Sequence, residues 1–268
     1  VGGNYQGEAG NPRANNLSFS GVAHADALTD GDGGEIVLWS DGVTEFAGEV
    51  SASGAGEGAG GLVETSGLAQ LNVDESAQVL TSADSGQMGT WLLDPTELAV
   101  VATGGSAGIV GSVNTTADSQ LNLSTLVAAL DGTNVTLQAI DSITIESEIN
   151  TTGNAAAGNL RLESPTLNLN EEISLRPGSL LTGTVTTVNL GVTGRLQNAV
   201  DAVATGGTIN LSAATYQSGE TIINRDVSLV GQGASNTVLD GLNNSRVFNI
   251  SNGTVAIDGV TIQNGSAA

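Results

Sequence analysis

The acidic residues of segment 30–41 come closest in this chain to the spacing of a metal-binding motif. Asp30 and Asp32 alternate with glycines, and Asp41 falls at the twelfth position, where a calcium-binding EF-hand loop places its last ligand. The fifth position is a glycine without a ligand side chain, and the sixth is Glu35, where that loop requires glycine. We therefore interpret the segment as a polar turn, with a weak calcium contact at Asp30 and Asp32 as the alternative and no other cofactor.

Gly56, Gly58 and Gly61 have the G-x-G-x-x-G spacing of a dinucleotide-binding turn. That turn binds pyrophosphate only between a strand and the N-terminus of a helix. Here a strand pattern follows, and the carboxylates of Glu57 and Glu64 would repel phosphate. We predict an ordinary turn.

His24 is the only histidine, and the chain contains neither cysteine nor lysine. A zinc site needs several histidine or cysteine ligands, so the composition argues strongly against one. Any histidine-based catalytic triad would have to be built around His24 alone. We expect instead a partly exposed histidine close to Asp26.

Carboxylates near the C-terminus are the candidates for sugar chemistry. A glycosidase needs two carboxylates, and a polygalacturonate lyase needs carboxylate-bound calcium and a basic residue. The nominees are Asp240, Asp258 and Glu220 as acids and Arg225 or Arg246 as base. Because Asp240 and Asp258 each precede glycine, as turn residues do, we expect no enzyme.

Short runs of β-branched and aliphatic residues separate these polar segments, and Gly, Asn or Asp lies close to each run. Such runs are typical of short strands joined by tight turns. The clearest ones are 36–39, 98–101, 135–138, 143–145, 227–230 and 255–257. The segments 33–39 and 60–67 echo each other at roughly the length of one solenoid turn. Pro95 should end the strand before it, because proline cannot donate to a strand ladder.

Two short helices interrupt the strand pattern. We predict one over Thr125–Leu130, with Ser124 as N-cap and Gly132 as its end. The second is predicted over 194–205, because apolar residues recur there at helical spacing between Thr193 and a pair of glycines.

Composition narrows the classes of partner. The 268 residues include 38 glycines and have a formal net charge of −22, so we expect neither nucleic acid nor an anionic membrane surface as a ligand. No apolar run reaches the roughly 20 residues that span a bilayer, so we expect no membrane insertion. Two Trp, two Tyr and three Phe leave the core mainly to aliphatic residues.

These patterns predict an all-β protein, a right-handed parallel β-helix with one or two short helices. Coils of about 22 residues would give roughly 10–12 rungs and a rod roughly 50–60 Å long. Composition divides the chain into regions 1–95, 96–192 and 193–268.

Several blocks of the first two regions carry a family resemblance. They resemble large secreted exoproteins of the filamentous haemagglutinin type, which use two-partner secretion and are common in cyanobacteria and other Gram-negative bacteria. The blocks similar to the repeat region of those proteins are Gly2–Gly7, Ala25–Ala27, Gly31–Gly42, Thr44–Phe46, Gly61–Gly67 and Gly89–Pro95. The blocks similar to the segment that follows this region are Leu126–Leu130, Asn134–Leu137 and Ser142–Ile145. The Asn-Pro-Asn-Gly type of secretion signature is absent, so we expect an internal segment. Only Ser-Ala-Ala follows the last predicted strand and its turn, and nothing there would cover an open end rung, so we expect further coils beyond residue 268.

The third region is similar to the start of a pectin-lyase-like parallel β-helix, with a leading helix and the first coils. The matching blocks are Leu196–Val200, Gly207–Ile209, Ala214–Tyr216 and Val255–Gly265. The first 192 residues would then be haemagglutinin-like coils, and 193–268 would open the second β-helix.

The two resemblances imply a structural segment of a secreted or cell-surface adhesin or fibre of a Gram-negative bacterium. The partners so implied are an outer-membrane secretion transporter and a cell-surface or glycan receptor. We expect further that the segment associates end to end, because an uncovered end rung exposes unpaired backbone groups. The alternative functions are a carbohydrate-active β-helix, a lyase or glycosidase, and a carbohydrate-binding one.

Overall fold

Strands form where every second side chain is apolar, because alternation turns one face of a strand to the core and the other outward. In β12 (Asn134–Gln138), Val135 and Leu137 are buried and the polar residues beside them are partly exposed.

The structure is a computed structural model that describes residues 5–8, 12–103, 119–217 and 219–266. As predicted, it is all-β, and every pairing between its named strands is parallel.

Two large sheets and four small ones contain the strands. The eleven-stranded sheet has the order β1 (Leu17–Phe19), β4 (Val43–Phe46), β7 (Gln70–Val73), β11 (Ser119–Asn122), β10 (Glu97–Val101), β13 (Ser142–Ile145), β16 (Thr166–Leu169), β19 (Val185–Leu190), β20 (Val203–Leu211), β23 (Val227–Val230) and β26 (Val255–Asp258). The six-stranded sheet has the order β18 (Leu181–Gly183), β15 (Leu160–Glu163), β12, β9 (Thr90–Leu93), β6 (Leu62–Gly67) and β3 (Glu35–Ser40). The small sheets are β2 (Val22–His24), β5 (Glu49–Ser51) and β8 (Gln78–Leu80); β14 (Ile149–Asn150) and β17 (Ile173–Ser174); β21 (Thr215–Gln217), β24 (Val238–Asp240) and β27 (Thr261–Gln263); and β22 (Thr221–Ile223) and β25 (Phe248–Ile250).

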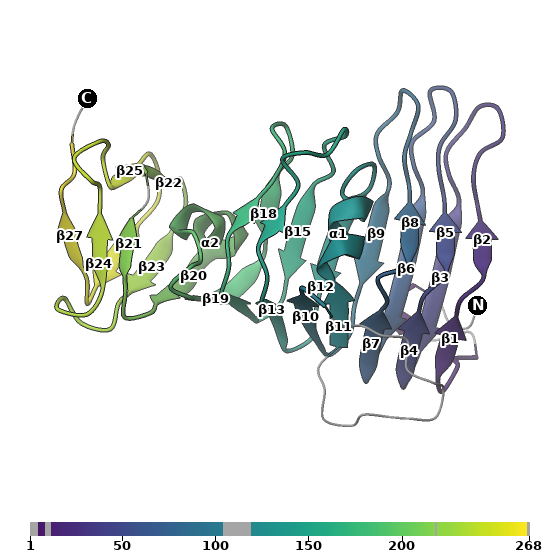
Figure 1. Cartoon of the computed structure of the whole chain (residues 1–268), viewed down its shortest axis with the longest axis horizontal. Helices are drawn as coiled ribbons and strands as arrows, with labels where there is room; N and C mark the ends of the chain where they lie inside the picture. The colour runs from purple at the N-terminus through teal and green to yellow at the C-terminus, as the bar shows by residue number, and fades with distance from the viewer. Residues whose placement is uncertain (1–4, 9–11, 104–118, 218, 267–268) are drawn as a thin grey trace.

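The chain visits these sheets in a repeating order. From β1 it passes through β2 and β3 and returns to the eleven-stranded sheet at β4, and we call each such circuit a coil. Successive coils follow one another along the long axis of the molecule, from purple to yellow in Figure 1. Leu17 pairs with Thr44, 27 positions later, whereas Thr166 pairs with Thr187, only 21 positions later. The predicted coil of about 22 residues is therefore too short for the N-terminal half.

One insertion breaks the regular order. In the eleven-stranded sheet, β11 lies between β7 and β10 although it follows both in sequence, whereas β6, β9 and β12 remain direct neighbours in the six-stranded sheet. The helix α1 (Leu123–Ala129) follows β11 and packs beside β8. The insertion thus adds a strand to the eleven-stranded sheet and a helix beside the small sheet of β2, β5 and β8. It adds nothing to the six-stranded sheet.

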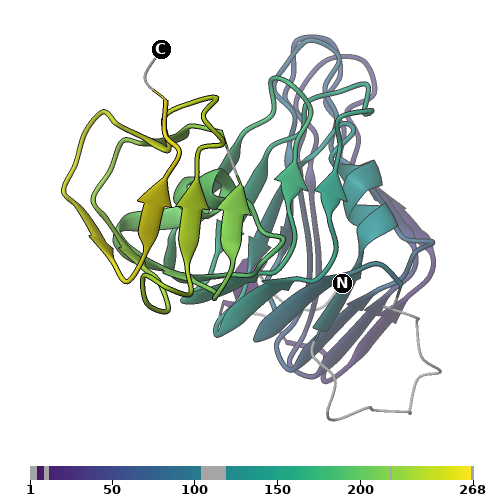
Figure 2. The same cartoon turned by 60° about the vertical axis from the view of Figure 1, so that its left-hand side comes forward.

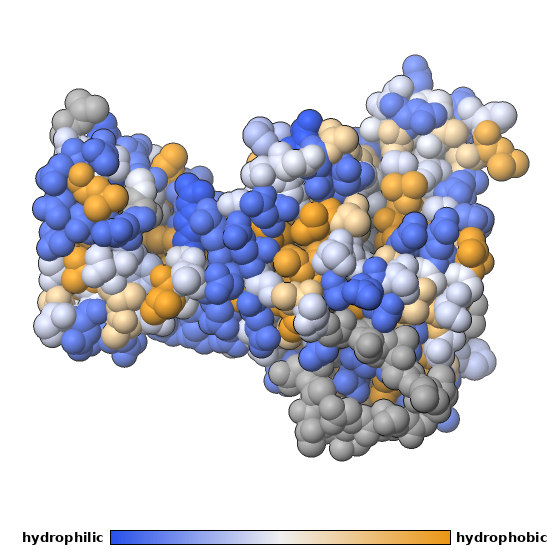
Figure 3. Space-filling view, viewed as in Figure 1, coloured by the Kyte–Doolittle hydropathy of each residue, from blue (hydrophilic) through white to orange (hydrophobic). Residues whose placement is uncertain are grey.

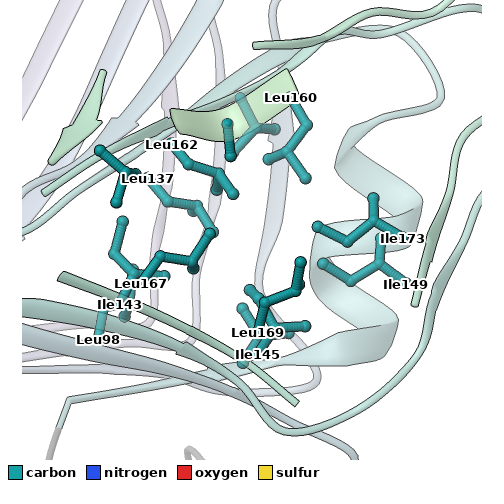
Figure 4. Close-up of a cluster of buried hydrophobic side chains, with 14 of the residues drawn as sticks. Leu98, Leu137, Ile143, Ile145, Ile149, Leu160, Leu162, Leu167, Leu169 and Ile173 are labelled. Atoms are coloured by element: carbon teal, nitrogen blue, oxygen red, sulfur yellow. The ribbon is translucent and has the colours of Figure 1, made fainter. Parts of the chain in front are cut away.

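Stacked aliphatic side chains fill the interior. Ile143 pairs with Leu167 and Ile145 with Leu169, so that like residues lie above one another from coil to coil. Figure 4 shows these files meeting Leu137 and Leu162 from the opposite sheet. One hydrophobic cluster extends from Leu38 to Val247. The boundaries between the three predicted regions, at 95/96 and 192/193, stay predictions.

Aromatic residues play a larger part in the N-terminal core than the sequence analysis predicted. Trp91 and Phe46 are fully buried, and their rings meet edge to face with centroids 6.5 Å apart. Phe19 stacks on Phe46 at 6.2 Å. The longer coils of this half enclose a wider cross-section, and large rings fill it.

Both helices differ from the prediction at their ends. Helix α1 begins at Leu123, two residues early, because Asn122 is its N-cap and accepts from the backbone N–H of Ser124 at 2.9 Å. Helix α2 (Leu196–Ala202) ends well before the two glycines, because Val203 already belongs to β20. Arg195 occupies its N-cap position and makes no side-chain capping bond.

The face drawn in Figure 3 is mostly polar, with separate hydrophobic areas. Figure 2 turns the C-terminal coils forward and shows their strands side by side. Among the described residues, neither helix has the length and apolar character needed to cross a bilayer.

Candidate functional site

The only histidine lies on the small sheet formed by β2, β5 and β8. His24 is the last residue of β2 and pairs in register with Ser51, the last residue of β5. Residues paired in this way point to the same face, so the imidazole and the hydroxyl meet. The His24 Nδ1 lies 2.6 Å from the Ser51 Oγ.

Asp26 completes the group from the turn that follows β2. Its Oδ2 accepts a hydrogen bond of 2.6 Å from the Ser51 hydroxyl, and its Oδ1 accepts one of 2.6 Å from the backbone N–H of Ser53. The His24 Nδ1 is 3.5 Å from the Asp26 carboxylate, and half of the imidazole is exposed. A partly exposed histidine beside Asp26 is thus confirmed.

Hydrogen bonding controls the charge of Asp26. Partial burial by itself would raise the pKa of this carboxyl, but the bonds from Ser51 and Ser53 and the nearby His24 outweigh it and hold the pKa below its usual value. Asp26 is therefore ionised at neutral pH.

The proton arrangement differs from that of a hydrolase triad. Ser51 has one hydroxyl proton, which it donates to ionised Asp26, so its oxygen must accept from the Nδ1–H of His24. In a triad the imidazole takes the hydroxyl proton and the carboxylate binds the other ring nitrogen. Here both groups use the same hydroxyl, so the arrangement suits hydrogen bonding to a ligand and not activation of Ser51.

A groove of about 830 Å³ opens beside this group, between the small sheet and α1. Its polar lining includes His24, Asp26, Glu49 and Glu75, and Val79 and other apolar side chains form part of its wall. The groove offers hydrogen-bonding groups and negative charge, which would favour neutral or cationic ligands over anionic ones.

The residues nominated for calcium have structural partners. The Asp32 Oδ1 accepts from the backbone N–H of Ala59 in the next coil at 2.7 Å. Asp41 lies 3.2 Å from the guanidinium of Arg13. Within the described ranges, no three His, Cys, Asp or Glu side chains are grouped so that they could hold a metal ion. A weak calcium contact at Asp30 and Asp32 stays a prediction.

The nominated sugar-chemistry residues also have structural surroundings. The Asp240 carboxylate accepts bonds of 2.9 Å from the Gln263 side chain, the Leu242 N–H and the Asn264 side chain, and these bonds lower its pKa. Asp258 lies at the end of β26, on a different sheet.

No contact among the described residues brings the other nominated residues to the Asp240 carboxylate. These are the bases Arg225 and Arg246 and the acid Glu220. The Arg225 guanidinium donates to the carbonyl of Val203 at 2.8 Å. Arg246 is exposed and Glu220 is partly exposed.

The glycine-rich turn behaves as predicted. Gly56 has a φ of 63°, a left-handed conformation, and Gly61 directly precedes β6. An added Cβ at Gly61 would lie 2.0 Å from the carbonyl oxygen of Gly34 in the previous coil. These glycines allow close approach between coils.

A second group of ionisable residues, which the sequence pattern did not predict, lies on the outer face of the six-stranded sheet. Glu64 is completely buried there, and Trp39 and Asp94 are nearly so. The sequence does contain one sign of this group: Glu64 lies in an apolar strand whose pattern repeats that of the strand containing Trp39. Period-two alternation, however, predicts that the Glu64 side chain points outward, and an outward side chain is expected to be exposed. The covering segment came from residues far away in sequence.

No protein-family model matches this chain, and no curated protein has a sequence that matches it significantly.

Proposed function

We propose that this chain is a right-handed parallel β-helix that serves as a stiff structural segment of a secreted cell-surface adhesin or fibre. The observation that carries the proposal is the eleven-stranded parallel sheet, in which strands from successive coils pair along the whole length of the molecule. Parallel strands joined by circuits of 20 to 28 residues through the other sheets are the expected pattern of such a fold.

The energetics favour a mechanical role. Each coil contacts mainly its two neighbours, so bending the stack would break ladder hydrogen bonds and separate stacked aliphatic side chains at the same time. The asparagine row on the outer face of the eleven-stranded sheet adds bonds between coils. Asn189 donates to Asn168 at 2.9 Å, and Asn210 donates to Asn189 at 3.0 Å. Rigidity without disulfides would follow from these repeated contacts.

Small-angle scattering and force spectroscopy together test the structural role. Eleven strands at about 4.8 Å spacing predict a rod roughly 50 Å long, and pulling the chain along this axis should release coils in successive steps of similar length. Scattering from a sphere, or a single all-or-none rupture at low force, would contradict a stiff stalk.

The biological setting rests on the resemblance to haemagglutinin-type exoproteins and is part of the same proposal. An outer-membrane transporter of a Gram-negative bacterium would export the chain, and end-to-end contact between copies would extend the fibre. Expression with and without a two-partner transporter, followed by protease treatment of whole cells, would test export. Accumulation only inside the cell in both cases would refute it.

The groove beside His24 favours carbohydrate binding as the second candidate function. Sugar hydroxyls need the mixture of donors and acceptors that His24, Ser51 and Asp26 present. Neutral glycans should shift the NMR signals of these residues, and Asp26→Asn should weaken that binding. Glu57→Gln, an exposed charge change outside the groove, is the matched control.

A further inference from the structure

The outer face of the six-stranded sheet is covered near the N-terminus by a short segment. This segment, the N-terminal strap, consists of Tyr5, Gln6, Gly7 and Glu8, and its first three residues form the single turn η1 (Tyr5–Gly7). Val37, Glu64 and Leu92 occupy one outward row across β3, β6 and β9. Trp39 and Ser66 start the next row. Glu64, Trp39 and Leu92 point away from the core and are nevertheless 0 %, 3 % and 2 % exposed.

Specific contacts hold the strap in place. The backbone N–H of Gln6 donates to the Glu64 Oε2 at 2.8 Å, and the Gln6 side chain donates to Gln138 at 3.0 Å. Gly7 lies so close to the Trp39 ring that an added Cβ would be 2.4 Å from it. Arg13 donates to the Gly7 carbonyl at 3.0 Å.

The backbone of the strap has a conformation that these contacts must maintain. Gln6 has a φ of 52°, in the left-handed region that residues other than glycine seldom adopt. Such a residue keeps this conformation only where its surroundings hold it. The Gln6 N–H that reaches Glu64 belongs to this strained residue.

The covered face contains buried polar atoms that have no hydrogen-bond partner among the residues that the structure describes. They are the Glu64 Oε1, the Asp94 Oδ1 and the Trp39 Nε1. A neutral carboxyl tolerates such a place far better than a carboxylate, because an ionised group that is buried without a cation loses its hydration.

No cation among the charged groups described at this face compensates the two acids. The strap contributes Tyr5, β3 contributes Glu35, and β15 contributes Glu163, which is paired with Arg161. Arg13, the cation near the strap, is paired with Asp41.

Burial raises the pKa of Glu64 from its ordinary 4.5 to about 7, and the charges of Asp94 and Glu35 add to this effect against the hydrogen bonds from Gln6 and Ser66. Burial, with the charge of Glu163, raises the pKa of Asp94 to about 6.

We propose that the N-terminal strap is a proton-controlled cover: it stays on the six-stranded sheet while Glu64 and Asp94 are neutral, and it leaves the sheet when they ionise. Release would hydrate both carboxylates and relax Gln6. It would also expose the apolar ring of Trp39, against which Gly7 packs.

The direction of the pH effect follows from proton binding. The docked state holds the proton on Glu64 more tightly than the released state, so docking is favoured fully below the ordinary pKa of 4.5. This preference is lost as the pH rises from 4.5 to about 7. Glu64 alone would change the ratio of docked to released strap by about two orders of magnitude.

Proteolysis of the full chain tests the cover. Trypsin can cut after Arg13 only when Arg13 leaves Gly7 and Asp41, and exposed Arg246 gives an internal reference cut. From about pH 5 to about pH 8, the rate after Arg13 relative to Arg246 should rise at least about tenfold in the wild type. In Glu64→Gln, whose amide cannot ionise, only the effect of Asp94 should remain, so the rise should be clearly smaller than in the wild type. With Asp94→Asn added, the relative rate should change less than about twofold, whereas Glu57→Gln should behave as the wild type.

Tryptophan emission gives a second measurement on the same proteins. The emission should move to longer wavelength over the same pH range, and Trp39→Phe should remove this shift because Trp91 remains in the core. Equal pH dependence of cleavage in the wild type and Glu64→Gln would overturn the proposal. So would an emission shift that persists without Trp39, or no pH dependence of either measurement.

Discussion

The side-chain amide of Asn198 makes both of the hydrogen bonds to the backbone of Ile173 that a neighbouring strand would make. Its Oδ1 accepts from the Ile173 N–H at 3.0 Å, and its Nδ2 donates to the Ile173 carbonyl at 3.0 Å. On the other side of α2, Gln197 does the same for Ile222, at 2.8 and 3.3 Å. Helix α2 thereby replaces a strand between β17 and β22 and pairs the backbone groups of Ile173 and Ile222.

Replacing Asn198 with alanine should therefore destabilise the protein strongly. Both backbone groups of Ile173 would lose their partners in a buried place, at a cost of about 2–4 kcal/mol in the free energy of unfolding. Gln197→Ala is the matched control and should cost less than about 1 kcal/mol, because Ile222 is half exposed and water can replace the amide. Urea unfolding monitored by circular dichroism would measure both. Equal losses would mean that burial does not distinguish the two bonds.

The core position of Leu229 gives a sharper test of strand alternation. Leu229→Asp places an unpaired charge among stacked aliphatic residues and should prevent folding or cost several kcal/mol. Ser228→Asp adds the same charge on the outward neighbour and should change stability by less than about 1 kcal/mol. Thermal melts compare the two. A Leu229→Asp protein that melts like the wild type would show the register to be wrong.

The hydrogen bond from Ser51 should control the titration of Asp26. In Ser51→Ala the pKa of Asp26 should rise toward its ordinary value, because the carboxylate loses a donor that stabilises its charged form. In the wild type, the lowered pKa contributes stability above the unfolded-state value of 3.8 that is lost as the pH falls through the folded-state value. Carboxyl NMR titration would follow the change. An unchanged or lower pKa in Ser51→Ala would contradict the hydrogen-bond account.

Alanine substitutions in the asparagine row should lower the free energy of unfolding by an amount that depends on the position. Asn189→Ala removes its bonds to both Asn168 and Asn210 and should cost about 1–2 kcal/mol. Asn210→Ala removes one of these bonds and should cost about half as much. Chemical denaturation of both variants would settle the order. A larger loss at Asn210 would mean that the row contributes little and that other contacts dominate.

Much of the fold was predictable because it depends on local pattern. The strands around 36–39, 135–138 and 227–230 formed as predicted, and the echo between 33–39 and 60–67 proved to be the direct pairing of β3 with β6. Like residues recur at the length of one coil because they must stack in one file. The position of His24 beside Asp26 followed from their closeness in sequence.

Other features needed the folded chain. The place of β11 between β7 and β10 reverses sequence order, and no local pattern encodes that choice. The use of Asn198 and Gln197 as substitutes for strand backbone depends on which strands lie on either side of α2.

By itself, the sequence determined the all-β class, the short strands and turns, the acidic surface and most of the aliphatic files, because each depends on neighbours a few residues apart or one coil away. Only the tertiary structure decided that Glu64, on the outward face of its strand, is buried beneath Gln6. The reason is physical: alternation fixes which face of a strand a side chain occupies, whereas its exposure and its charge depend on what packs against that face.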